Sequence, residues 1–160
     1  MNVDLNEAAT PAFGFEREHR RLDHLLRTHL LAVVGADFAS AHDKLARWQR
    51  ALLRHIDIEN TRLLLHVPAG ARWDARVYRL EHERIALLAD EYAARVRAVA
   101  ARPPRGERAR RMAALSLLDA AHSLRHLLEH HHQREEMALA NELPDDVMRA
   151  AWLPTVARAG

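Results

Sequence analysis

Four long stretches without glycine or proline constrain the fold of this chain more than any other feature. They cover residues 15–34, 36–67, 71–102 and 107–143. Within each stretch, apolar residues recur three and four positions apart, as on one face of an α-helix, and the alternation typical of strands is absent. Good helix formers (alanine, leucine, arginine and glutamate) dominate. The sequence therefore predicts an all-α fold, an up-down-up-down four-helix bundle with short connections.

The length and composition fit one compact unit. The chain has 160 residues, of which 49% are hydrophobic and 29% charged, so it is too apolar for disorder and long enough to bury a core. We expect a single domain over residues 1–160 with its helical core at about 15–143. Pro144 precedes Asp145–Ala151, which we expect to form a short fifth helix at the C-terminal end.

The charge and the missing residue types argue against several classes of protein. A net charge of +2 is small for a nucleic-acid binder. The arginines between residues 102 and 111 lack interleaved aromatic residues, and we expect them to be solvated. No apolar run is long enough for a membrane span, and Asp4 and Glu7 argue against a signal peptide. The absence of cysteine excludes disulfides and thiolate ligands. We expect a cytoplasmic monomer or homodimer with no nucleic-acid or membrane partner.

Histidine is abundant, with 12 residues, and one histidine has a carboxylate at helical spacing. His55 and Glu59 lie four residues apart in the second stretch, so a helix places them on one face, one turn apart. A histidine nitrogen and a carboxylate oxygen that converge in this way make half of a metal site. The pair alone is weak evidence, and its weight depends on the rest of the chain.

A weak internal repeat supplies matching residues on the other predicted helices. Glu18-His19 in the first stretch resembles Glu81-His82 in the third, and both histidines fall on the apolar stripe. In the fourth stretch the repeat Leu-Leu-x-His selects His130, whereas the apolar stripe selects His131 with Glu135 one turn later. Helix geometry is the stronger argument, and we therefore predict His131.

Six groups on the inner faces cannot be buried without partners, because an unpaired buried carboxylate costs several kcal/mol. Two divalent cations would satisfy all of them together. The predicted metal ligands are His19, His55, Glu59, His82, His131 and Glu135. We expect His24, His42, His122 and His126 to face solvent, and His29 or His66 to lie just outside the ligands.

The Glu-His of the first and third helices and the His-x-x-x-Glu of the second and fourth resemble the hemerythrin-like family, or HHE cation-binding domain. The resemblance implies a four-helix bundle with a non-haem di-iron centre, oxo- or hydroxo-bridged. His19 and His55 would hold one iron and His82 and His131 the other, with Glu59 and Glu135 bridging. It also implies a diatomic ligand, dioxygen or nitric oxide.

Two departures from the oxygen-carrying members stand out. Ala86 occupies the place of a fifth histidine, four residues after the histidine of the third helix. Those members also end with His-x-x-x-x-Asp, whereas this chain offers Glu135. We therefore expect two histidines on each iron, with room for an added ligand. The chain could bind or store dioxygen, sense a gas, or turn over peroxide.

Two other interpretations remain open. A ferritin-like di-iron oxidase would use Glu16-x-x-His19 and Glu129-x-x-His132, which leaves His55 and His82 unexplained. A metal-free helical interaction module would use the histidine–glutamate pairs as buried hydrogen bonds. Because no triad, phosphate loop or separate acid–base pair is present, a binding or sensing protein is favoured over a dedicated enzyme.

Overall fold

A computed structural model describes residues 12–153, and in this range the chain is helical with no strand. The prediction that the chain has no signal peptide concerns N-terminal residues that lie outside this range. The α-helices are α1 (Ala12–Val34), α2 (Phe38–Ile58), α3 (Ala75–Ala101), α4 (Glu107–Ala120), α5 (His122–Arg134), α6 (Ala140–Glu142) and α7 (Asp145–Ala151). Three further helical segments are a π-helix at Glu59–Leu63, a 3₁₀-helix at Leu64–His66 and a π-helix at Glu135–Leu139. The all-α prediction is confirmed, and so is the short helix at Asp145–Ala151.

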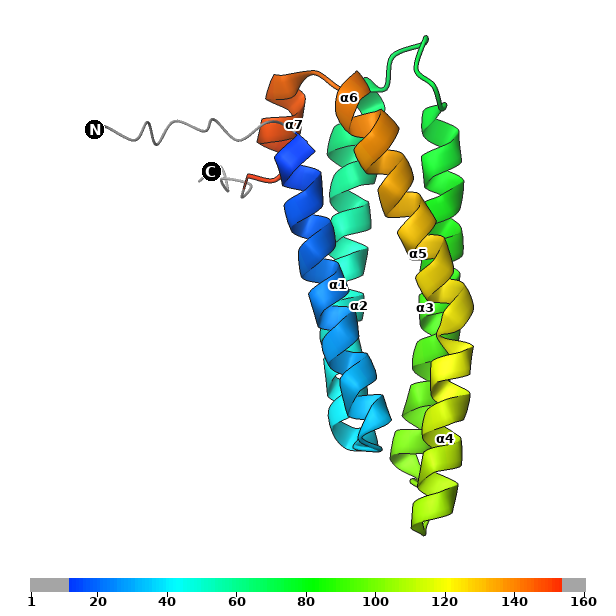
Figure 1. The fold of residues 1–160 in the computed structure, drawn as a ribbon. Helices are drawn as coiled ribbons and strands as arrows, with labels where there is room; N and C mark the ends of the chain where they lie inside the picture. The colour runs from blue at the N-terminus through cyan, green and yellow to red at the C-terminus, as the bar shows by residue number, and fades with distance from the viewer. Residues whose placement is uncertain (1–11, 154–160) are drawn as a thin grey trace, which may run out of the picture.

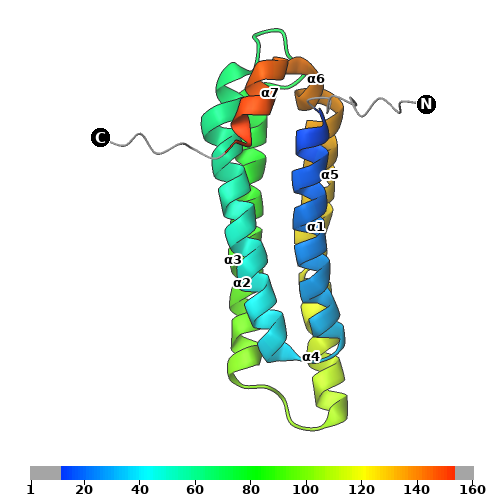
Figure 2. The same ribbon diagram turned by 90° about the vertical axis from the view of Figure 1, so that its left-hand side faces the viewer.

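The long helices lie side by side and form a helical bundle. Figures 1 and 2 show α1, α2, α3 and the rod made by α4 and α5 next to one another, with α7 at the end where α1 begins. The fourth predicted helix is not continuous. It turns at Ala121, although Ala121 N–H still bonds to the Leu117 carbonyl and Arg125 N–H to that of Ala121. Nothing in the sequence at this turn explains the interruption.

The two π-helices begin at Glu59 and at Glu135, which are matching positions of the internal repeat. In each, the wide turn closes by a bond from the residue five positions later, Leu64 N–H to the Glu59 carbonyl and Ala140 N–H to that of Glu135. Single π turns inside α-helices occur frequently at functional sites. The helix periodicity of the sequence did not predict them, since it assumes regular α-helix throughout.

A polar layer divides the apolar core into two clusters. The larger cluster contains Leu22, Leu52, Ile85 and Leu128 among others. The smaller is closed by α7 and contains Phe15, Leu63, Leu64, Tyr78, Leu139, Ala140, Leu143, Met148 and Ala151. On every long helix the predicted ligands lie between a residue of one cluster and a residue of the other. Apolar packing at both ends therefore holds these polar groups in place and keeps bulk water away from them.

Candidate metal centre

All six residues that the sequence predicted as ligands are buried and lie together. Each is at most 4% exposed. The structure groups four of them, His19, His55, Glu59 and Glu135, so that one nitrogen or oxygen from each lies within 4.8 Å of the others. A second group of the same kind is formed by Glu59, His82, His131 and Glu135. The two glutamates belong to both groups.

Each glutamate spans the two groups with its two oxygens. Glu59 Oε1 lies 2.9 Å from His55 Nε2, and its Oε2 lies 3.1 Å from His82 Nε2. Glu135 Oε2 lies 3.2 Å from His19 Nε2, and its Oε1 lies 3.0 Å from His131 Nε2. A carboxylate placed in this way has one oxygen for each of two cations.

Three of the histidines are oriented from outside by hydrogen bonds at Nδ1. His131 Nδ1–H donates to Glu81 Oε2 at 2.9 Å, and Glu81 is itself paired with Arg134 at 3.1 Å. An outer acceptor of this kind orients the ring so that Nε2 is the nitrogen available to a metal, as in histidines that bind metals.

The π-helices supply the outer acceptors for the other two. His82 Nδ1–H donates to Asn60 Oδ1 at 2.9 Å, and His19 Nδ1–H donates to Glu136 Oε1 at 2.7 Å. Asn60 and Glu136 each follow the first glutamate of a π-helix. Each π-helix thus places two consecutive residues at the candidate centre. The first, a glutamate, faces the inner nitrogens, and the second accepts a hydrogen bond from the outer nitrogen of a histidine on another helix.

The inward-facing atoms have close neighbours but no hydrogen bonds. The nitrogen–oxygen approaches described above are ion-pair contacts of 2.9–3.2 Å that fall outside hydrogen-bond geometry. The buried atoms without a hydrogen-bond partner include both carboxylate oxygens of Glu59 and of Glu135, and the Nε2 atoms of His19, His55, His82, His131 and His132. Leaving this many buried polar atoms unsatisfied is expensive, at about 1–3 kcal/mol each.

The charges of the centre compensate one another through shifted pKa values. Burial and Glu135 tend to raise the pKa of Glu59, but His55 and His82 outweigh them and lower it to about 2. Burial tends to lower the pKa of His131, but Glu135 and Glu81 raise it to about 10. In the protein without metal the carboxylates are therefore ionised and protons reside on histidines.

Burial distinguishes the two neighbouring histidines that the sequence analysis compared on the fourth helix. His131 is 2% exposed and faces Glu135, whereas His130 is exposed and contacts the ring of His126. The ferritin-like arrangement finds no support in burial, because Glu16 and Glu129 are both exposed.

The remaining histidines differ from expectation in part. His24, His122 and His126 are exposed, as predicted. His42, which we also expected to face solvent, is half-buried, with 41% of its side chain exposed. The prediction that His29 or His66 lies just outside the ligands is wrong. His66 is exposed, and both ring nitrogens of His29 are bonded elsewhere in the core.

His132 is the buried histidine that the sequence analysis missed. It is 7% exposed and its ring stacks on that of His19, with centroids 3.9 Å apart and planes at 7°. Burial, and after it the neighbouring His19, lower the pKa of His132 to about 3, so its ring is neutral. The apolar stripe selected His131 among three consecutive histidines, and the sequence analysis considered His132 only in the ferritin-like interpretation.

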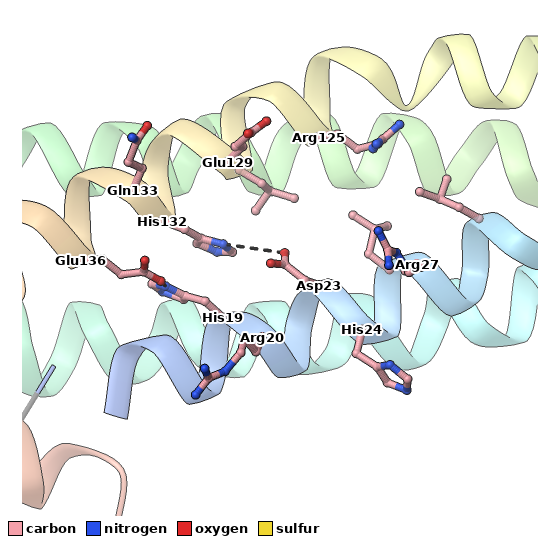
Figure 3. A pocket seen from close by; sticks show the side chains of 13 residues that line it. His19, Arg20, Asp23, His24, Arg27, Arg125, Glu129, His132, Gln133 and Glu136 are labelled. Atoms are coloured by element: carbon pink, nitrogen blue, oxygen red, sulfur yellow. Dashed lines mark hydrogen bonds and ion pairs between the residues drawn. The ribbon is translucent and has the colours of Figure 1, made fainter. Parts of the chain in front are cut away.

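A surface cleft of about 880 Å³ lies beside His19 and His132, between α1 and α5. Figure 3 shows His132 and Asp23 extending toward each other across it, with Glu136 beside His19. Its lining is strongly charged and includes Arg20, Asp23, Arg27, Arg125 and Glu129. The two stacked histidine rings thus stand between this cleft and the inner carboxylates.

Comparisons of the chain with models of known protein families, with curated proteins and with solved structures find no match. The resemblance to the hemerythrin-like family therefore stays a prediction from the motifs. None of the helices within residues 12–153 combines the length and the apolar character needed to cross a membrane.

Proposed function

We propose that this chain is a hemerythrin-like protein that holds two iron ions in an up-down-up-down four-helix bundle and binds a small diatomic ligand, dioxygen or nitric oxide, there. The observation that carries the proposal is the set of buried, inward-facing nitrogen and oxygen atoms without hydrogen bonds. Two cations placed among the two groups would satisfy these atoms together.

The donor set fits iron. Imidazole nitrogens mixed with carboxylate oxygens, without thiolates, suit Fe(II) with coordination positions left open. His19 and His55 would hold one iron, His82 and His131 the other, and Glu59 and Glu135 would each contribute to both. When bound, such a pair of irons supplies reducing electrons and open coordination positions for a diatomic ligand.

The surrounding residues prepare the centre for that role. Glu136, Asn60 and Glu81 accept from the outer nitrogens and so direct Nε2 of each partner histidine toward the inner carboxylates. On the side of α7, the ring of Trp152 stacks on His55 at 5.1 Å. The chain thus orients the ligand atoms and limits water, and we infer a binding or sensing protein of the cytoplasm.

The metal-free interaction module is the second candidate, and the geometry disfavours it. That function requires the histidine–glutamate pairs to be hydrogen bonds, and the inner approaches lack that geometry. A metal-free module also gives no reason for the π-helices that begin at Glu59 and Glu135.

The test is metal analysis of protein purified without a histidine tag and supplied anaerobically with ferrous iron. We expect two irons per chain, with an absorption spectrum that changes on exposure to air or nitric oxide. His55→Ala and Glu59→Ala should lose binuclear loading while keeping helical circular dichroism. His126→Ala, which removes an exposed histidine of α5, is the matched control and should load normally. Wild-type protein that takes up no iron overturns the proposal.

A further inference from the structure

Three exposed histidines form a row along the outer surface of α5, apart from the candidate metal centre. His122, His126 and His130 follow one another at four-residue intervals, and all three are exposed. Residues four positions apart on a helix lie one turn apart on the same face. The neighbouring His131 instead faces Glu135 inside the bundle. The histidine row and the buried centre therefore use different faces of one helix.

The histidine row has no role in holding the fold together. Its rings are exposed, and within the described part of the chain they take part in ring contacts with one another but in no hydrogen bond or ion pair. Arg125 and Glu129, both exposed, flank His126 with opposite charges, so the local charge does not repel a cation. The ring nitrogens of the row are thus accessible to a dissolved ligand.

The spacing of the rings fits a shared metal ion. The ring centroids of His126 and His130 are 4.4 Å apart, and those of His122 and His126 are 6.2 Å apart. A zinc–nitrogen bond of about 2.0–2.1 Å allows two imidazole rings on one ion to have centroids up to about 6.5 Å apart. The two end histidines are separated by about 12 Å along the helix axis. Each candidate pair therefore includes His126.

We propose that His126 and His130, the closer pair, form a surface site for a divalent cation late in the first transition series: copper(II), nickel(II) or zinc(II). Neutral imidazole is a good ligand for these ions, and a given nitrogen site binds copper(II) most tightly among them. Ferrous iron stands near the weak end of the same order. The surface site therefore does not add to the two irons expected in the buried centre, and His126→Ala still loads that centre.

The first test is the retention of tag-free protein on a column of immobilised nickel(II), because a resin-bound ion reaches only surface histidines. Wild type should be retained. His126→Ala breaks both pairs and should elute at a clearly lower imidazole concentration. His24→Ala removes an exposed histidine of α1 that has no histidine four residues away, and it is the matched control that should elute with wild type. Failure of wild type to bind overturns the inference, and so does an equal effect of the two substitutions, since the histidines would then act singly.

Copper(II) binding in solution gives a second measurement. After equilibrium dialysis, wild type should hold one more copper ion per chain than His126→Ala. His122→Ala, which keeps the closer pair, should hold as many as wild type. The apparent copper affinity of the surface site should fall at least about tenfold in His126→Ala, since even the loss of a residue supporting a ligand costs 10- to 100-fold.

The comparison separates this inference from the proposed function. Copper bound in the buried centre contributes equally to wild type and His126→Ala, so it cancels in the difference whether or not that centre loads iron. Because the substituted side chains are exposed, the circular dichroism of the variants should match that of wild type. Equal copper contents of wild type and His126→Ala overturn the surface site and leave the proposed function standing.

Discussion

Helix α1 carries two buried histidines ten residues apart, and they differ in what satisfies them. His29 donates from Nδ1 to the Ala41 carbonyl at 2.7 Å and accepts at Nε2 from the Tyr92 hydroxyl at 2.8 Å. His19 has an outer bond to Glu136, while its inner nitrogen faces Glu135 without a hydrogen bond. The protein itself completes one site and leaves the other incomplete.

The difference shows how a ligand site can be told from a buried polar network. Burial of histidine alone is ordinary when both nitrogens find partners. The region around His29 needs nothing further and acts as a structural tie between α1, α2 and α3. The region around His19 concentrates unsatisfied atoms of ligand type, and it is there that we expect a metal.

The largest expected effect is stabilisation of the protein by metal. A ligand that binds only the folded state at a thousandfold excess over Kd stabilises by about 4 kcal/mol per site. We expect the denaturation midpoint of wild type to rise strongly when ferrous iron or zinc is added to the metal-free protein. Glu59→Ala should show little of this rise, because Glu59 contributes to both groups. If wild type is equally stable with and without metal, the region around His19 is not a metal site, and its contrast with the region around His29 fails.

A smaller effect separates the two histidines of α1 by the same substitution. His29→Ala should lower the free energy of unfolding by about 2–4 kcal/mol, because it opens a cavity and leaves the Ala41 carbonyl and Tyr92 hydroxyl unpaired. Metal content should not change. His19→Ala is the matched variant and should lose metal. Denaturant titration and metal analysis of both proteins measure this, and a loss of metal in His29→Ala would show that the regions are not independent.

The sequence was sufficient for the helices and for the burial of the six residues predicted as ligands. Long periodic segments place His19, Glu59 and His82 on inner faces, and all are buried as predicted. The four-residue spacing of His131 and Glu135 also favoured His131, which is buried, over His130, which is exposed. These features depend on helix geometry within one segment, which a sequence contains.

What the sequence could not provide depends on contacts between helices. The wide turns at Glu59 and Glu135 bring Asn60 and Glu136 behind histidines of other helices, which regular periodicity does not anticipate. The place of His132 follows from its stacking on His19, and that of His29 from its bond to Tyr92. Each is a tertiary contact between residues distant in sequence.

The smallest effect concerns pH, and its sign distinguishes the regions. Burial lowers the pKa of His29 below the ordinary value of 6.5, so the folded state keeps it neutral while the unfolded chain takes up a proton. Its stabilising contribution is complete above about pH 6.5 and is lost as pH falls toward the lowered pKa. His19, His82 and His131, which face the carboxylates, have raised pKa values and the opposite sign. In metal-free protein, the cost of His29→Ala should therefore shrink by about 1 kcal/mol between pH 7.5 and 5.5. Denaturant titrations of wild type and variant at both pH values measure this difference, and a cost that stays constant or grows on acidification would mean that His29 is charged in the fold.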